Sequence, residues 1–154
     1  MSWIVFAPTF LEVAGVDRHT QHADRSFADI LISSAVGWGD PSRDHAFMGK
    51  ERHDVGREGD LGYPVRCLRT KEFLYVRNYE PNRWPGWNPE TGFTNVDCLP
   101  TKSLILEQQK TRNDWYYDLS FGKRLAEELF HMREDTVCTH NLADEAEHPE
   151  IEQK

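Results

Sequence analysis

The sequence predicts an α+β fold, in which an antiparallel sheet of about four strands has helices flanking it. Two patterns predict this class. Apolar residues recur at helical spacing over residues 6–13 and 26–32, whereas residues 64–79 alternate between two sets of side chains, as strands do. A length of 154 residues suits one domain with a modest core. We therefore expect a single domain, with a helical part over residues 1–36 and a sheet over residues 43–154.

The two N-terminal helices have ordinary start and stop signals. In residues 6–13, Pro8 falls where the first turn tolerates a proline, and Gly15 follows as a stop. Ser26 can cap a second short helix that extends to residue 32, because a serine hydroxyl accepts a hydrogen bond from the first turn. A loop containing glycine and proline follows over residues 37–41.

The strands are predicted by local alternation. Residues 45–50 form a first short strand that leads into a charged loop over residues 51–62. Residues 64–70 and 73–79 both alternate and are joined by a short polar turn, which predicts a β-hairpin. The second run places aromatic and basic side chains on one face: Phe73, Tyr75, Arg77 and Tyr79.

The remainder of the chain has weaker patterns. Residues 80–100 contain four prolines, two glycines and two tryptophans, so we expect an ordered loop in which the indoles, Trp84 and Trp87, pack against other residues. Residues 103–110 favour a short helix, and the aromatic residues 114–119 favour extended structure. A strand is expected over residues 123–130, and Pro149 onward is typical of the first turn of a helix.

The charge of the chain excludes one class of partner. A net charge of −8 argues against general nucleic-acid binding, which needs a basic surface to neutralise phosphates. Residues 43–83 carry nine Lys or Arg and seven Asp or Glu, whereas residues 126–154 carry two and nine. The middle of the chain therefore suits an anionic ligand, and the C-terminal part is expected to be a solvated acidic surface.

Cysteines, membrane spans and targeting signals add little. Cys67, Cys98 and Cys138 lack the spacing of a zinc site or of a disulfide framework, so we expect free thiols. No apolar stretch approaches the roughly 20 residues of a membrane-spanning helix. Residues 1–14 lack a basic n-region and contain Glu12, so they do not predict a signal peptide, and the sequence leaves the compartment unknown.

A series of short motifs runs through the chain. Residues 49–54 read Gly-Lys-Glu-Arg-His-Asp, residues 63–66 read Tyr-Pro-Val-Arg, and the predicted hairpin follows. Further motifs are Arg-Trp-Pro at 83–85, Pro-Thr-Lys at 100–102, Ala-Glu-Glu-Leu at 126–129 and Asn-Leu-Ala at 141–143. In this order they resemble the C-terminal part of bacterial sulfatases of the arylsulfatase type, especially those similar to heparan N-sulfatase.

The resemblance implies a fold and a reaction class. Residues 1–36 would be the helical end of the large sulfatase domain, and residues 43–154 the C-terminal sheet subdomain of the alkaline-phosphatase-like fold. The chain would be a fragment of a hydrolase of sulfuric esters or sulfamates, such as those of glycosaminoglycans. The parent enzyme, periplasmic or secreted, would need formylglycine and a divalent cation, by expectation calcium. Because the nucleophile and metal ligands would lie elsewhere, no residue here is assigned to catalysis or metal binding, and the isolated chain is expected to be inactive.

Five residues match the substrate side of the family. His53, Asp54 and Arg66 correspond to a region near the substrate pocket of heparan N-sulfatase-like enzymes, and Lys50 and Arg52 would serve the same pocket. An arginine can bind a sulfate or carboxylate bidentately, and an aspartate can accept hydrogen bonds from sugar hydroxyls. The alternative is structural: Arg66 and Asp54 would form an ion pair, and His53 would cap the end of a strand.

Two other patterns resemble functional motifs but are not assigned a function. Cys98 begins Cys-Leu-Pro-Thr-Lys, which resembles the formylglycine signature C/S-x-P-x-R, but lysine replaces its arginine and the Thr-Gly that normally follows is missing. We therefore do not assign Cys98 as the nucleophile precursor. His19 and His22 have a spacing compatible with a shared metal ion, but no further ligand completes the set, so surface histidines are expected.

Two other functions remain open. The chain would alternatively be a non-catalytic module that binds sulfated glycan or a partner subunit, or a fragment of a related phosphate-ester hydrolase. A further expectation concerns the N-terminal segment, which holds several large apolar residues: Trp3, Ile4, Phe6 and Phe10. Exposed apolar patches promote association, so a homo-oligomer is expected through this segment.

Overall fold

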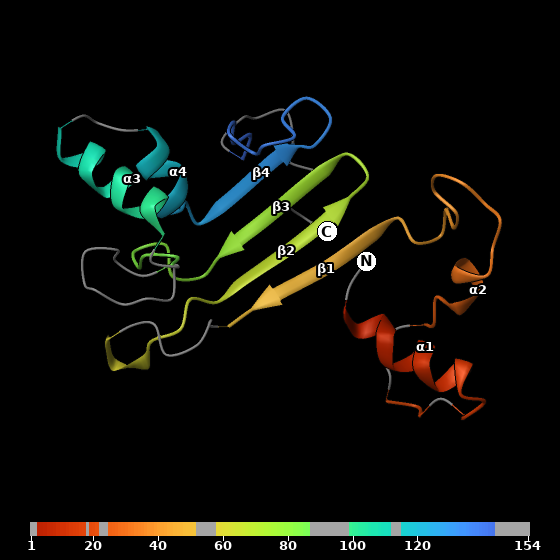
Figure 1. Cartoon of the computed structure of the whole chain (residues 1–154). Coiled ribbons are helices and arrows are strands. Elements are labelled where there is room, and N and C mark those ends of the chain that lie inside the picture. The colour runs from red at the N-terminus through yellow and green to blue at the C-terminus, as the bar shows by residue number, and fades with distance from the viewer. Residues whose placement is uncertain are drawn as a thin grey trace. The chain divides into compact units, whose positions relative to one another are not determined.

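The protein is an α+β chain built around one four-stranded antiparallel sheet (Figure 1). This computed structural model describes residues 3–17, 19–21, 25–51, 58–86, 99–111 and 115–143. The chain divides into two compact units, Met1–Phe47 and Met48–Lys154. The predicted fold class, an α+β chain with a four-stranded antiparallel sheet, is confirmed.

The described residues of the first unit form two short α-helices. A 3-10 turn at Trp3–Val5 leads into α1, which spans Phe6–Val13 as predicted. Helix α2 spans Ala28–Leu31, slightly shorter than expected. The predicted Ser26 cap is wrong: the N-cap of α2 is Phe27, which makes no side-chain cap hydrogen bond, and the Ser26 hydroxyl one residue earlier accepts the backbone N–H of Ala28 at 3.0 Å in a local turn.

A buried threonine joins the two helices of this unit. The hydroxyl of Thr9 donates to the Val5 carbonyl at 2.6 Å and accepts the backbone N–H of Phe27 at 3.1 Å. The ring of Phe6 packs edge-on against that of Phe27, with centroids 5.7 Å apart. The Thr9 hydroxyl therefore accepts a hydrogen bond from a buried N–H just before α2 and donates its own hydrogen to a carbonyl just before α1.

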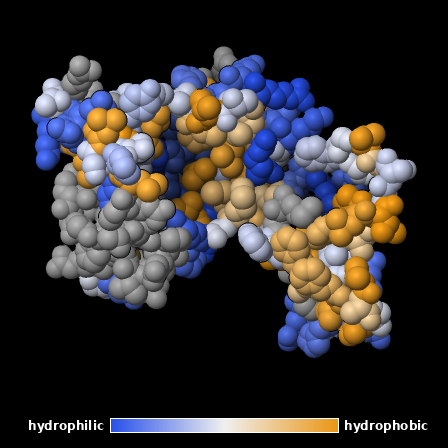
Figure 2. All heavy atoms as spheres, in the orientation of Figure 1, coloured by the Kyte–Doolittle hydropathy of each residue, from blue (hydrophilic) through white to orange (hydrophobic). Residues whose placement is uncertain are grey.

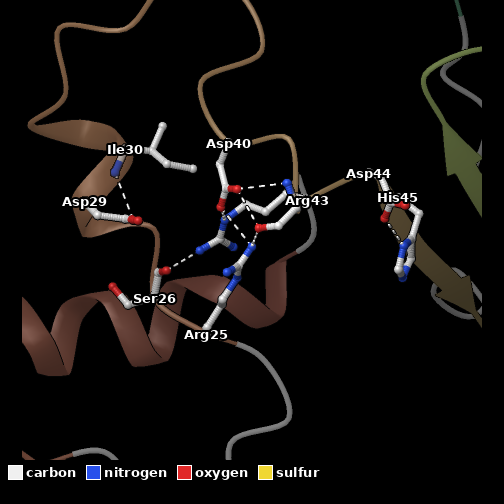
Figure 3. A network of polar contacts seen from close by, with 9 residues as sticks. Arg25, Ser26, Asp29, Ile30, Asp40, Arg43, Asp44 and His45 are labelled. Carbon is white, nitrogen blue, oxygen red and sulfur yellow. Dashed lines mark hydrogen bonds and ion pairs between the residues drawn. The ribbon is translucent and has the colours of Figure 1, made fainter.

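A carboxylate holds the loop that follows α2 (Figure 3). Asp40 accepts hydrogen bonds from Arg25 at 2.8 Å and Arg43 at 3.1 Å, and from the Ser42 hydroxyl at 2.5 Å. Arg43 also donates to the carbonyl of Ser26. The hydrogen bonds from Ser42, together with both arginines, lower the pKa of Asp40. The loop is thereby tied to the segment that precedes α2.

The sheet has its strands in chain order, β1-β2-β3-β4. The strands are β1 at His45–Lys50, β2 at Val65–Thr70, β3 at Phe73–Asn78 and β4 at Glu127–His131. The boundary between the two compact units falls within β1. The hairpin prediction is confirmed, since β2 and β3 pair antiparallel, whereas β4 begins later than residue 123.

Between β3 and β4, the described part of the chain forms two helices. Helix α3 spans Pro100–Thr111 and is longer than predicted, and α4 spans Trp115–Phe121. The prediction of extended structure over residues 114–119 is wrong. A strand there would need a sheet edge for its backbone hydrogen bonds, whereas a helix satisfies them internally. No helix in the described ranges is long and apolar enough to cross a bilayer.

The aromatic residues of α4 pack against the preceding loop. Tyr117 and Phe121 are buried, and the Trp84 ring lies edge-on to Tyr117 with centroids 6.5 Å apart. The ammonium group of Lys123 lies 5.5 Å from the centre of the Trp84 ring. The expectation that Trp84 packs against other residues is confirmed, while Trp87 lies outside the described residues.

The outer edge of β4 is closed by a side chain. The backbone N–H of Leu129 donates to the Asn141 side-chain oxygen at 2.8 Å, and the Leu129 carbonyl accepts the N–H of Leu142 at 2.8 Å. The amide nitrogen of Asn141 donates to the Glu127 carbonyl at 3.2 Å. Asn141 and Leu142 thus make the hydrogen bonds that a neighbouring strand would make.

One carboxylate shapes the turn that returns the chain to this edge. Asp135 accepts the backbone N–H groups of Thr139 at 2.6 Å and His140 at 2.7 Å, and the Thr139 hydroxyl at 3.2 Å. These hydrogen bonds, that of His140 first, lower the pKa of Asp135.

We predict that Asn141→Ala lowers the free energy of unfolding by about 1–3 kcal/mol, because it leaves the N–H of the fully buried Leu129 without its acceptor. Urea denaturation measures the loss. Val137→Ala is the control: Val137 is 74% exposed in the same turn region, and its removal should change stability by less than about 0.5 kcal/mol. Equal effects of the two substitutions would contradict the role of Asn141.

We also predict that the turn around Asp135 opens in acid. The folded-state pKa of Asp135 lies below the ordinary value of 3.8. The hydrogen bonds to its carboxylate therefore stabilise the turn at pH values above 3.8, and this stabilisation is lost as the pH falls through the lowered pKa. The amide signals of Thr139 and His140 should therefore shift in an NMR titration below about pH 4. Asp135→Asn should remove this transition, and an unchanged titration in that variant would refute the assignment.

Candidate functional site

Four charged residues lie in a row across the sheet. Arg66 on β2 is the register partner of Arg77 on β3, and Arg77 is the partner of Glu127 on β4. Register partners project from the same face of a sheet. Glu51, directly after β1, contacts Arg66 from the other side. We call Glu51, Arg66, Arg77 and Glu127 the charged row, in which the signs run negative, positive, positive, negative.

Each arginine of the row pairs with the carboxylate next to it. The Arg66 guanidinium group binds Glu51 and donates to the carbonyl of Val65 at 2.9 Å, while Arg77 binds Glu127. Both arginine side chains are 50% exposed, Glu51 is 67% exposed and Glu127 is 32% exposed. The row is therefore a surface feature that ligands in solution can reach.

A glycine makes room for Arg66 on the neighbouring strand. A Cβ atom added to Gly49 would lie 3.2 Å from Cδ and 3.5 Å from Nη1 of Arg66. Arg66 therefore extends over β1 where that strand has no side chain. A larger residue at position 49 would push the guanidinium group away from Glu51.

Two tyrosines hold Arg77 in place. Tyr75 and Tyr79 share its face of the sheet, because side chains two apart in a strand point the same way. The Arg77 guanidinium carbon lies 5.7 Å from the centre of the Tyr79 ring. A hydrogen bond with the Tyr75 hydroxyl, followed by the charge of Glu127, raises the pKa of Arg77, while burial raises the pKa of Tyr75.

The structure separates two of the predicted substrate-side residues. Arg66 lies in the charged row, and Lys50 is the exposed last residue of β1. Gly49 lies beside Arg66, and strand side chains alternate, so Lys50 points to the opposite face of the sheet. The other predicted residues, Arg52, His53 and Asp54, lie outside the described residues, so the proposed pocket and the alternative Arg66–Asp54 pair stay predictions.

The sequence reasoning missed two members of this site. Glu51 is the ion partner of Arg66, but in the sequence it is one of many charged residues of a loop. Arg77 was placed on the aromatic face of its strand without being assigned to the site. A signal for it existed: residues 66 and 77 lie equally far from residues 70 and 73, the ends of the two predicted hairpin strands, which places Arg77 opposite Arg66.

The first unit contains a separate cavity of about 440 Å³. Among the described lining residues the one basic side chain, Arg25, is engaged by Asp40 and Ser42. Carboxylates contribute most of the remaining charge, and we assign no ligand to this cavity. The lining residues are Pro8, Glu12, Val16, Asp17, Arg25, Ser26 and Asp29.

The thiols and histidines that the structure describes form no recognisable centre. Cys67 and Cys138 are free thiols, and burial raises the pKa of both, whereas Cys98 lies outside the described residues. His19 is exposed and accepts the backbone N–H of Gln21 at 3.2 Å, and its predicted companion at position 22 is not described. Within the described ranges, His, Cys, Asp and Glu side chains nowhere gather in a group of three that would hold a metal ion.

The charged row offers binding chemistry. Guanidinium groups donate pairs of hydrogen bonds to the oxygens of sulfate, sulfamate or carboxylate groups. No protein-family model matches this chain, and a search of curated proteins finds no match either. The resemblance to sulfatases therefore rests on the ordered motifs in the sequence.

Proposed function

We propose that this chain is the C-terminal part of a sulfatase, a hydrolase of sulfuric esters or sulfamates, and that it contributes residues to the substrate side. The motif order supports this, as does the four-stranded antiparallel sheet, which lies where the resemblance implies one. The observation that carries the proposal is Arg66: it ends the Tyr-Pro-Val-Arg motif and presents a half-exposed guanidinium group on that sheet.

In this proposal the chain binds and orients the substrate. Arg66 donates hydrogen bonds to a sulfo group, and His53 and Asp54 contact the hydroxyl groups of the sugar. Arg52 adds positive charge around the same substrate, whereas Lys50, also predicted for this pocket, points to the opposite face of the sheet from Arg66 and is left out of the proposal. Formylglycine and calcium, supplied by the rest of the parent enzyme, would carry the attack on sulfur. The chain alone therefore has affinity for the substrate without turnover.

A second candidate is a non-catalytic module that binds sulfated glycan. The two exposed arginines of the charged row favour it, because such groups bind sulfated sugars without any catalytic machinery. The genome distinguishes the two candidates. An upstream reading frame that encodes the formylglycine signature C/S-x-P-x-R would favour the sulfatase.

We predict that the purified chain binds N-sulfated glucosamine more tightly than glucosamine and does not hydrolyse aryl sulfate in the presence of calcium. The sulfo group adds charge-assisted hydrogen bonds that glucosamine lacks. NMR titration of the arginine side-chain signals measures binding, and product release measures turnover. Turnover would contradict the division of roles, and equal binding of both sugars would contradict the sulfated substrate class.

We further propose that the first unit binds a second copy of this chain through its apolar surface. Trp3, Ile4 and Phe10 are 86%, 52% and 67% exposed, and Figure 2 shows apolar side chains gathered over α1 and α2. A standard interface needs about 800 Å² from each partner, and one aromatic side chain supplies about 150–250 Å². Other exposed apolar residues of this unit enlarge the surface: Val13, Val16, Leu31, Ile32 and Val36.

Light scattering on the purified chain should therefore give the mass of a dimer or a larger oligomer. The double variant Trp3→Ser with Phe10→Ser should shift the chain to a monomer, because it removes the largest exposed rings of the patch. Trp115→Ser is the matched control: Trp115 is 57% exposed but belongs to α4 in the second unit. If the unaltered chain remains a monomer at high concentration, the proposal is contradicted.

A further inference from the structure

We infer that Arg66 and Arg77 together form an anion-binding site. Glu51 and Glu127 pair with these arginines until an anionic ligand displaces the two carboxylates. The ligand class, a sulfo group on a sugar ring, rests on the proposed function. The paired arrangement of the two arginines does not, because it follows from the register of β2 and β3.

The register places two like charges directly opposite each other. Neighbouring strands are about 4.8 Å apart, and like charges in such a cross-strand pair are destabilising. Arg66 and Arg77 are nevertheless partners, and both project from one face. The carboxylates that pair with these arginines lie on either side of them: Glu51 directly follows the end of β1, and Glu127 is on β4. The positive potential is therefore highest above β2 and β3, where an anion would relieve the repulsion.

Replacing the internal carboxylates by a ligand costs little. All four side chains are about one-third to two-thirds exposed, and exposed ion pairs contribute little net free energy. A guanidinium group also has five N–H donors, more than one carboxylate accepts. The carboxylates therefore act as weak competitors that keep the arginines apart and extended while no ligand is bound.

The surroundings of Arg77 favour an anion attached to a ring. Tyr75 and Tyr79 restrict its guanidinium group through a hydrogen bond and a cation–π contact, so little side-chain freedom is lost on binding. Tyr79 is 54% exposed and offers an apolar face beside the charge. A sulfated sugar matches both features, since it brings an anionic group and a ring that packs on the tyrosine.

The experiment compares three arginines of the second unit. Arg66→Ala and Arg77→Ala should each weaken the binding of N-sulfated glucosamine by about fivefold or more, because each removes a charge-assisted contact. Arg133→Ala is the matched control, since Arg133 is 57% exposed and pairs with Glu72 at 3.2 Å. It should leave the affinity unchanged. Equal binding by Arg77→Ala and the unaltered chain would overturn the inference.

Two further variants separate a binding role from a structural one. Glu51→Gln and Glu127→Gln keep the side-chain shapes but remove the competing charges, so each should tighten binding of the sulfated sugar. If the row only supports the fold, these variants would lower the melting temperature and leave affinity unchanged, which would also overturn the inference. Circular dichroism melts of every variant are the control that tests whether the sheet is intact.

Inorganic sulfate distinguishes failure of this inference from failure of the proposed function. If sulfated and unsulfated glucosamine bind equally, but sulfate binds and both arginine variants weaken it, the anion site stands and the sulfated-sugar function fails. If Arg66→Ala abolishes binding of the sulfated sugar and Arg77→Ala does not, the function stands and this inference fails. Absence of binding to either anion overturns both.

Discussion

The register of the β2–β3 hairpin is the constraint on which the sheet and its charged row depend. The turn is held by Thr70, whose hydroxyl oxygen accepts the backbone N–H of Phe73 at 3.0 Å and that of Glu72 at 3.4 Å. This turn sets Arg66 opposite Arg77. A slip of one residue would turn one strand over and send the two arginines to opposite faces. The Thr70 side chain at the turn and the pairing of the two strands therefore together hold the row in place.

The charged row combines local neutrality with access to solvent. Each arginine has one carboxylate beside it, so the row adds no net charge to an acidic chain. Because the pairs are exposed, water and salt weaken them, and the fold does not rely on them for much of its stability. Such a surface tolerates exchange of one anionic partner for another without disturbing the buried residues of β4, Leu129 and Phe130.

Local patterns in the sequence predicted much of the fold, but they could not predict contacts between segments that are far apart in the chain. Helix α1 and strands β1 to β3 follow from spacing and alternation within the segments themselves. The segment of α4 has strand-like residues, but its conformation depends on which sheet edges are available elsewhere in the chain. In the site, Arg66 was found through its motif, whereas its pairing with Glu51 depends on how the loop after β1 is placed.

The closure of β4 by Asn141 has a consequence for how the chain behaves as it folds. Main-chain edges invite pairing with other chains, and here the cover comes from one side-chain amide near the end of the described residues. The sheet therefore has an uncovered edge until the turn held by Asp135 has formed. During synthesis Asp135 and Asn141 follow β4, so the delay between the strand and its cover governs the risk of intermolecular β-pairing.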